Sequence, residues 1–176
     1  TALYEAVMMA LRITGRRRVI VDECVSPIYR TILKSYTANL DIEYVETRPD
    51  NGLACRKSIA EELKEETAAV VVSNPNFFGC LDDFADLAEM VHARKSLLIV
   101  STYPISLGVV KTPGAMGADI VTGEGQSLGL PLNFGGPYLG FMSTTKEHMR
   151  KMPGRIAGKT LDRNGIGPLG AQPPVH

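Results

Sequence analysis

The sequence has no excess of either charge, few cysteines and no long apolar run, and each absence excludes a class of protein. Lys plus Arg and Asp plus Glu both number 19, so the formal net charge is zero and we expect neither a nucleic acid nor a membrane as partner. The longest apolar runs, such as 68–72, have strand length and are too short to cross a bilayer. We also expect no signal peptide, because Thr1 leads directly into a helical pattern.

Cysteine and histidine are too scattered to predict a metal site or a disulfide framework. The three cysteines, Cys24, Cys55 and Cys80, are widely spaced and contain no CxxC pair. The three histidines are isolated from one another in the sequence. A reducing cytoplasm is therefore the setting that we predict.

What is present is an alternation of helical and strand patterns over a chain long enough for one domain. The central strand patterns are apolar on both faces, which is typical of a mostly parallel sheet covered by helices on either side. We expect helices at 2–13, 26–36, 57–66 and 82–94, and strands at 18–22, 42–45, 68–72, 97–100, 120–122 and 138–142.

Several local signals mark the ends of these elements. Gly15 is expected to end the first helix, and Ser26 with Pro27 to begin the second as N-cap and first-turn residue. The arginines at 16–18 are expected to interact with the carboxyl end of the first helix. The last two strands have no helical pattern between them, so we predict that the final strand is antiparallel and the sheet mixed.

Residues 117–140 form the segment around which we expect the rest of the chain to be organised. It holds a strand, a long loop and seven glycines, and such a loop predicts backbone lying close to a ligand or another chain. An irregular connection with glycines at positive φ is the alternative. Ligands of such sheets bind at the carboxyl ends of the parallel strands, where we expect loops 74–79, 101–107 and 123–136 to meet.

Familiar chemistries fit this loop poorly. The glycines at 123, 125 and 129 are spaced differently from a dinucleotide loop and lead to Pro131 rather than to a helix. There is no Walker lysine pattern and no serine in a nucleophile elbow. Glu124 would serve as a general acid only if it were buried.

Three segments carry a resemblance to a known family: SNPNFFG (73–79), GADIVTGEGQSLGLPLNFGGPYLGF (117–141) and RKMPGRIAGKTLD (150–162). They resemble the P-protein of the glycine cleavage system, most closely its subunit 1, the α-type half of the split bacterial form. The resemblance covers about 1–165, which we interpret as one α/β domain that is incomplete at both ends. Residues 166–176 depart from the family as a Gly/Pro-rich tail that we expect to be disordered.

The resemblance implies a three-layer α/β/α fold with a mostly parallel mixed sheet, like the large domain of fold-type I pyridoxal-phosphate (PLP) transferases. It implies glycine decarboxylation with transfer of the aminomethyl group to the lipoyl arm of the H-protein. The implied partners are a β-type subunit 2 and lipoylated H-protein. In the family's catalytic half, a lysine eleven residues before a proline holds PLP, and the position that matches it here is Gln126.

The acid that fold-type I enzymes place near the pyridine nitrogen is missing as well, since the strand at 97–100 is followed by Ser101, Thr102 and Tyr103. We therefore predict no catalytic residue in this chain, a non-catalytic role, and PLP held by the partner subunit. The residues predicted to line a vestigial pocket or the subunit boundary are Asn74, Pro75, Asn76, Gln126, Ser127, Pro131, Asn133, Gly135, Gly136 and Pro137.

Two alternatives stay open at this point. The chain is an independent PLP enzyme in which another residue, such as Lys111, reaches the cofactor, or it is an interaction domain with no enzyme partner. For each polar candidate, hydrogen bonding within its own loop is as good an explanation as a functional contact. Arg155, in the family's MPGR element, is predicted to contact an anion or an interface.

Overall fold

The computed structural model describes residues 1–154. The domain boundary predicted near residue 165, the tail at 166–176 and Arg155 lie outside these residues. Within them, no helix has the length and apolar character needed to cross a membrane.

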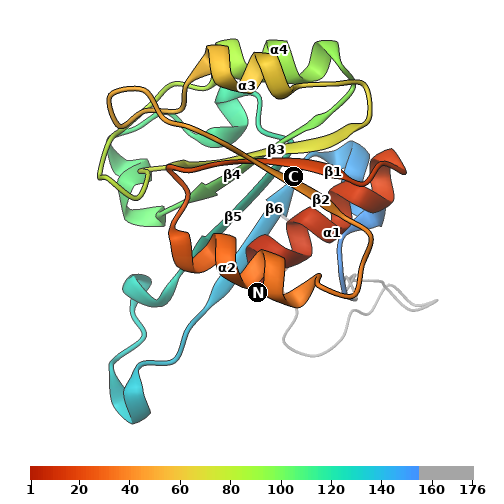
Figure 1. Cartoon of the computed structure of the whole chain (residues 1–176). Coiled ribbons are helices and arrows are strands. Elements are labelled where there is room, and N and C mark those ends of the chain that lie inside the picture. Colours follow the sequence, from red (N-terminus) through yellow and green to blue (C-terminus); the bar gives the residue numbers. More distant parts are fainter. Residues whose placement is uncertain (155–176) are drawn as a thin grey trace, which may run out of the picture.

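One mixed sheet organises the chain (Figure 1). Its strands lie in the order β2-β1-β3-β4-β5-β6, and all neighbours are parallel except β5 and β6, which pair antiparallel. The predicted orientation of the last strand is therefore confirmed. The bounds are β1 Arg18–Asp22, β2 Glu43–Thr47, β3 Thr67–Asn74, β4 Leu97–Thr102, β5 Ile120–Glu124 and β6 Gly140–Thr144.

Helices cover both faces of the sheet (Figure 1). Helices α1 (Ala2–Thr14) and α2 (Pro27–Tyr36) lie on one side, and α3 (Arg56–Glu62) and α4 (Ala85–Ala93) on the other. The remaining helical pieces are 3-10 turns: η1 Pro104–Gly108, η2 Pro113–Met116, η3 Gln126–Leu128, η4 Asn133–Gly135 and η5 Lys146–Lys151.

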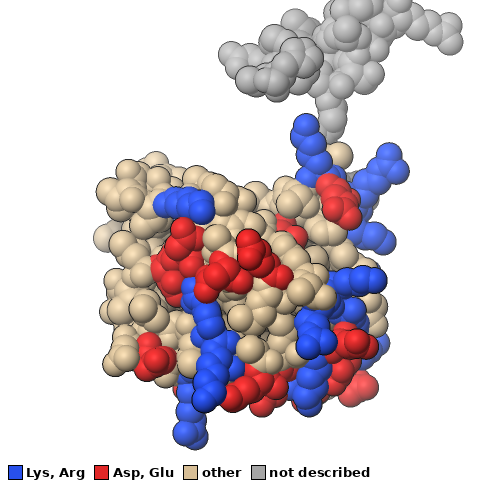
Figure 2. Space-filling model, turned by 90° about the horizontal axis from the view of Figure 1, so that it is seen from above, with Lys and Arg blue, Asp and Glu red and all other residues tan. Residues whose placement is uncertain are grey.

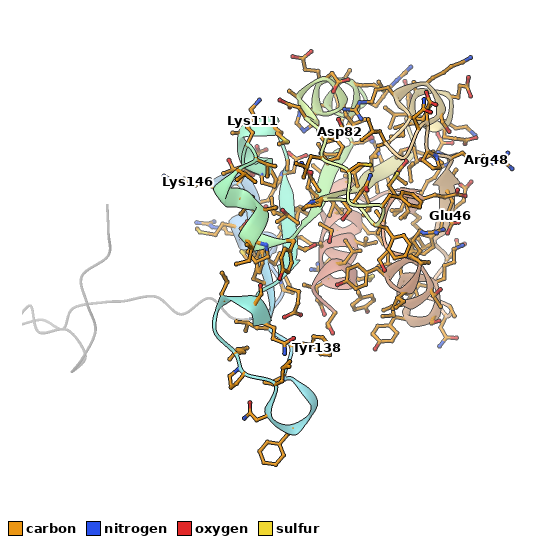
Figure 3. All side chains as sticks on the ribbon, turned by 90° about the vertical axis from the view of Figure 1, so that its left-hand side faces the viewer. Glu46, Arg48, Asp82, Lys111, Tyr138 and Lys146 are labelled. Carbon is orange, nitrogen blue, oxygen red and sulfur yellow. The ribbon has the colours of Figure 1, made fainter. Side chains whose placement is uncertain are left out.

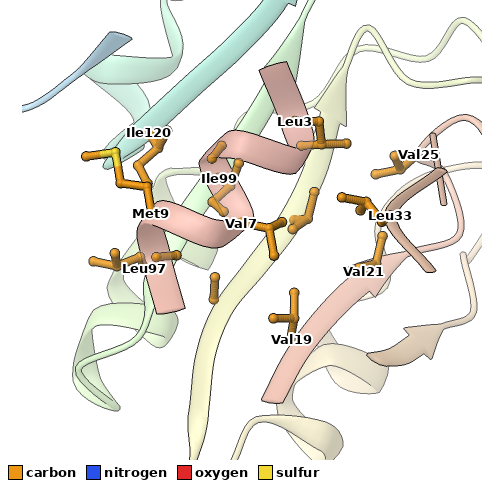
Figure 4. Packing of buried hydrophobic residues seen from close by; sticks show 14 residues of the cluster. Leu3, Val7, Met9, Val19, Val21, Val25, Leu33, Leu97, Ile99 and Ile120 are labelled. Atoms are coloured by element: carbon orange, nitrogen blue, oxygen red, sulfur yellow. The ribbon is translucent and has the colours of Figure 1, made fainter. Parts of the chain in front are cut away.

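Alternate residues of the central strands serve two separate apolar cores. Val19 and Val21 pack with α1 and α2, whereas Ile20 between them packs with the α3 and α4 side chains. This division follows from the two-residue period of a strand and explains why β1 is buried at all five positions. Figure 4 shows the first core, in which Val7 and Met9 of α1 lie against Leu97, Ile99 and Ile120.

Most of the end signals behave as expected. Gly15 ends α1 in the left-handed conformation with φ 69°, and its N–H donates to the Leu11 carbonyl. Pro27 is the first residue of α2, but the Ser26 side chain makes no capping bond.

The expectation for the arginines at 16–18 is wrong, because carbonyls and carboxylates elsewhere offer them better partners. Arg16 donates to the carbonyls of Thr67, Arg94 and Lys95. Arg18 lies within β1, is 3% exposed and pairs with Glu62.

Two helices are shorter than predicted. The third ends at Glu62, because Leu63 turns to an extended conformation and the Lys64 N–H donates to the Thr67 hydroxyl. The fourth begins at Ala85, because Asp82 is drawn into other contacts and Asp83 accepts from the Ala85 N–H. On the face that carries α3 and α4, basic and acidic side chains lie side by side (Figure 2), in keeping with a net charge of zero.

Candidate functional site

The carboxyl ends of the five parallel strands form one edge of the sheet, called here the carboxyl edge. The loops predicted to meet there do so. The Ser73 hydroxyl donates to the Ser101 carbonyl at 3.1 Å, and the Thr102 hydroxyl donates to the Asn74 carbonyl at 2.8 Å. The turns η1 and η3, from the second and third loops, are in contact.

Two further loops join this edge that sequence reasoning did not place there. Asp22, at the end of β1, is fully buried; its carboxylate accepts from the Cys24 N–H at 2.8 Å and from the Thr47 hydroxyl at 3.2 Å. The Phe77 N–H donates to the Cys24 carbonyl, which joins the loops after β1 and β3. These are the strands between which the strand order reverses, and a ligand crevice is common at such a point. In this chain, the backbone hydrogen bond between the loops after β1 and β3 crosses this point.

Cys24 is not a reactive thiol. Burial first, and then its hydrogen bond with Asp22 and the charge of that carboxylate, raise the pKa of Cys24 to about 12. A thiol with so high a pKa is protonated at neutral pH and is a poor nucleophile.

The side-chain amides of Asn74 and Asn76 are occupied by bonds to backbone groups of their own loop and, for Asn76, of the loop after β2. The Asn74 amide is 1% exposed and binds both the N–H and the carbonyl of Asp82. The Asn76 amide donates to the Gly52 carbonyl at 2.7 Å and accepts from the N–H groups of Phe78 and Cys80. Their polar atoms therefore shape the edge rather than point to an open site.

Residues 125–139, called here the arm, connect β5 to β6 and project away from the body of the molecule (Figures 1 and 3). The Gly125 N–H donates to the Leu139 carbonyl at 2.7 Å. The Glu124 carboxylate accepts from the N–H of Gln126 at 3.0 Å and from the N–H of Leu139 at 2.6 Å. Glu124 therefore holds the two ends of the arm together, which is a different role from that of a general acid.

Two glycines at the base of the arm have steric reasons to be glycine. A Cβ at Gly123 would lie 2.3 Å from the Thr102 carbonyl oxygen and 2.4 Å from the Phe141 ring. Gly136 has φ 82°, and a Cβ there would lie 2.7 Å from the Gln126 amide nitrogen. This nitrogen is buried and has no hydrogen-bond partner among the described residues. The Gln126 side chain is therefore turned back into the base of the arm, beside Gly136.

The ten candidate residues thus fall into two groups. Asn74, Pro75 and Asn76 lie at the carboxyl edge and the other seven on the arm, where all except Gln126 and Gly136 are exposed. Two pockets open elsewhere, of about 430 Å³ near His92 and His148 and about 410 Å³ beside Val121 and Phe141, and no candidate lines either one. Whether the ten form a functional boundary stays a prediction.

The titratable side chains near the base of the arm are those of Tyr29, Glu124 and Tyr138. Burial, and then the charge of Glu124, raise the pKa of Tyr29. This tyrosine lies in the first turn of α2, so α2 approaches the base of the arm. No group of three or more His, Cys, Asp or Glu side chains in the described part of the chain could hold a metal ion.

The arm contains no lysine. The lysines on either side of it in sequence are Lys111 and Lys146, and both lie away from the arm in Figure 3. The Lys111 ammonium is 3.4 Å from the Asp83 carboxylate. The end of β4 carries Ser101 and Thr102, both buried, and no carboxylate.

Comparison with known proteins gives one consistent family. The model of the family "Glycine cleavage system P-protein" matches residues 1–169. The probable glycine dehydrogenase (decarboxylating) subunit 1 of Geotalea uraniireducens is 56% identical over 165 residues, which are 94% of this chain and 37% of that protein. The corresponding protein of Maridesulfovibrio salexigens is 53% identical with the same coverage.

Solved structures agree. A crystal structure of glycine decarboxylase (P-protein) of the glycine cleavage system in inhibitor-bound form superposes with a TM-score of 0.87 and 44% identity, over 94% of this chain and 37% of that one. A cystathione gamma lyase from Micromonospora echinospora, 18% identical with a TM-score of 0.63 over 85% of this chain and 39% of that one, shares the fold. The predicted fold class, a three-layer sandwich like the large domain of fold-type I PLP transferases, is confirmed.

Proposed function

The chain belongs to the glycine cleavage system P-protein family, and on this premise we propose that it is part of subunit 1 of a split glycine dehydrogenase (decarboxylating). It spans 37% of the length of the relatives that it matches, so the activity is assigned to the whole heteromeric enzyme. That activity is decarboxylation of glycine with transfer of the aminomethyl group to the lipoyl group of the H-protein. The cytoplasmic setting stays a prediction.

We assign PLP to the β-type subunit 2, because the residues of this chain do not fit the cofactor. PLP chemistry needs a lysine amine for the imine and an acid near the pyridine nitrogen. Position 126 carries an amide that is turned into the base of the arm, and β4 ends without a carboxylate. The orientation and chemistry of Gln126 are the observation on which the non-catalytic role rests.

The alternative of an independent PLP enzyme needs another lysine at this edge. Lys111, which was the candidate, is engaged with Asp83 beside the start of α4. We therefore prefer a supporting role, in which this chain presents its carboxyl edge and arm to the partner.

Glycine–bicarbonate exchange with full-length subunits tests the proposal. We expect exchange, dependent on H-protein, only when subunit 1 and subunit 2 are mixed. Exchange by subunit 1 alone would show that this chain or its continuation holds PLP. A mixture that forms no complex and shows no exchange would reject the assignment to a split glycine dehydrogenase.

A further inference from the structure

The arm presents apolar side chains to solvent with no charge among them. From Gly125 to Leu139 there is no Lys, Arg, Asp, Glu or His. Phe134 is 106% exposed, Tyr138 83% and Leu132 81%. Isolated exposed leucines are ordinary on protein surfaces, but a contiguous exposed patch marks a binding surface.

The base of the arm is fixed, so these side chains are held outward by a defined structure. The bond from Gly125 to Leu139 extends the β5–β6 pairing by one step, and the Glu124 carboxylate closes the base from the side. Beyond the base, the chain makes the turns η3 and η4, with Gly136 against Gln126. A surface prepared in this way loses less conformational entropy when it binds.

The arm continues a wider apolar surface. Of the large hydrophobic side chains exposed in the described residues, all except Tyr36, Leu40 and Met149 lie in segments that follow the carboxyl ends of the parallel strands. In Figure 2 the left-hand rim is mostly free of charged side chains, whereas the exposed Arg48, Asp50 and Asp83 lie in the same segments as these apolar residues. Outside the arm, this surface comprises Ile28, Tyr29, Leu53, Phe77, Phe78, Leu81, Tyr103, Ile105 and Val109.

The size and chemistry of the surface indicate a protein partner. With roughly 150–250 Å² for each aromatic side chain, Phe134 and Tyr138 alone expose on the order of 350 Å². That is already a large part of the roughly 800 Å² that one partner buries in a standard interface. Peripheral membrane surfaces pair apolar side chains with Lys and Arg that attract anionic headgroups, and the arm has neither.

We propose that the arm is the docking element of this chain and inserts into an apolar, uncharged cleft of the partner subunit. This inference rests on the proposed function, in which subunit 1 works with a second subunit. The absence of charge on the arm calls for a cleft without unpaired charge, because a charged group buried against the arm would find no counter-charge there. Large aromatic and aliphatic side chains at the tip are suited to anchor such an interface.

Binding of full-length subunit 1 to full-length subunit 2 tests the inference, measured by calorimetry and by size-exclusion chromatography with light scattering. The test variant is Leu132→Ser combined with Phe134→Ser. Both residues are exposed among the described residues and lie outside the two cores, so circular dichroism and the unfolding midpoint should match those of the wild type. A lowered midpoint would show that the arm packs against the rest of subunit 1, and would overturn the inference. The matched control is Leu40→Ser, an exposed leucine of the opposite edge.

We expect the double variant to bind subunit 2 at least tenfold more weakly, which corresponds to about 1.4 kcal/mol, and the control to bind within twofold of the wild type. Wild-type binding and exchange that persist unchanged in the double variant would overturn the arm's role and leave the proposed function intact. An arm-dependent homodimer of subunit 1, with unchanged binding to subunit 2, would also overturn it. If the wild-type subunits do not associate, the proposed function itself fails.

Discussion

The Glu124 carboxylate offers a sharp test of how the arm is held. Replacing Glu124 by Ala removes the acceptor for two backbone N–H groups, those of Gln126 and Leu139. A hydrogen bond to a charged group contributes about 1.5–3 kcal/mol when it is well buried, and we take about 1 kcal/mol each because Leu139 is exposed. The local opening free energy at the base of the arm should therefore fall by about 2 kcal/mol.

Amide hydrogen exchange followed by NMR measures this opening directly. A loss of about 2 kcal/mol corresponds to roughly thirtyfold faster exchange of the Leu139 amide. Global stability should change by less than about 0.5 kcal/mol, because Glu124 lies outside both apolar cores.

Glu124→Gln is the control, since it keeps an oxygen acceptor and removes only the charge. We expect its effect on the Leu139 amide to be about half as large in free energy, roughly fivefold in rate. Equal exchange rates for Leu139 in the wild type and in Glu124→Ala would refute the view that this carboxylate holds the arm.

Three further predictions concern stability and cofactor binding. Gly123→Ala should destabilise the fold by about 3 kcal/mol, and lower the melting temperature by roughly 6–12 °C, because the new Cβ meets a backbone carbonyl. Gly125→Ala, whose nearest contact would be 3.3 Å, should cost less than about 1 kcal/mol in the same thermal scan, and equal losses would contradict the steric argument. The hydrogen bond from Arg56 lowers the pKa of Asp86, so stability held above about pH 4 should be lost as the pH falls through the lowered value. In Arg56→Ala, urea titrations from pH 7 to 2 should show a smaller loss with acid, and an unchanged acid profile would count against this pair. Gln126→Lys should give no PLP adduct after borohydride reduction, because the side chain is directed into the base of the arm and β4 supplies no acid; a stoichiometric adduct at position 126 by peptide mass mapping would overturn this reading.

The sheet could be predicted from the sequence because its signals are local and strong. Runs such as 68–72 are apolar at every position, and the lack of a helical pattern before β6 was enough to predict its antiparallel direction. Strand ends were less exact: β6 begins at Gly140 rather than at Tyr138, because the Leu139 N–H donates to the Glu124 side chain instead of to a backbone carbonyl of the neighbouring strand.

Two of the misses share a physical cause, which is competition from partners distant in the sequence. Arg18 looked like a helix-end residue, yet Glu62, 44 residues away, draws it into a partly buried pair. Asp82 looked like the start of a helix, yet Arg56 and Asn74 engage it. Such contacts form only after the sheet has brought the segments together, so a local sequence pattern cannot predict them.

The candidate site was predictable in location but not in shape. The sequence indicated which loops meet at the carboxyl edge, and the hydrogen bonds of Ser73 and Thr102 confirm the meeting. It did not indicate that seven of the ten candidates would stand on a projecting arm. That outcome depends on Glu124 closing the base, and a lone glutamate in a glycine-rich loop carries no recognisable signal for such a role.

Because Gly125 and Leu139 are hydrogen-bonded to each other, the arm between them can be exchanged as a unit. The chain leaves and re-enters the sheet at a bonded pair, so a graft between these residues would need only to match one short end-to-end spacing. An insertion within β3, by contrast, would exchange the residues that face the two cores. The segment from 127 to 137 is therefore the place to insert a fluorescent label or a photo-crosslinker, and to exchange binding specificity between related chains without redesigning the sheet.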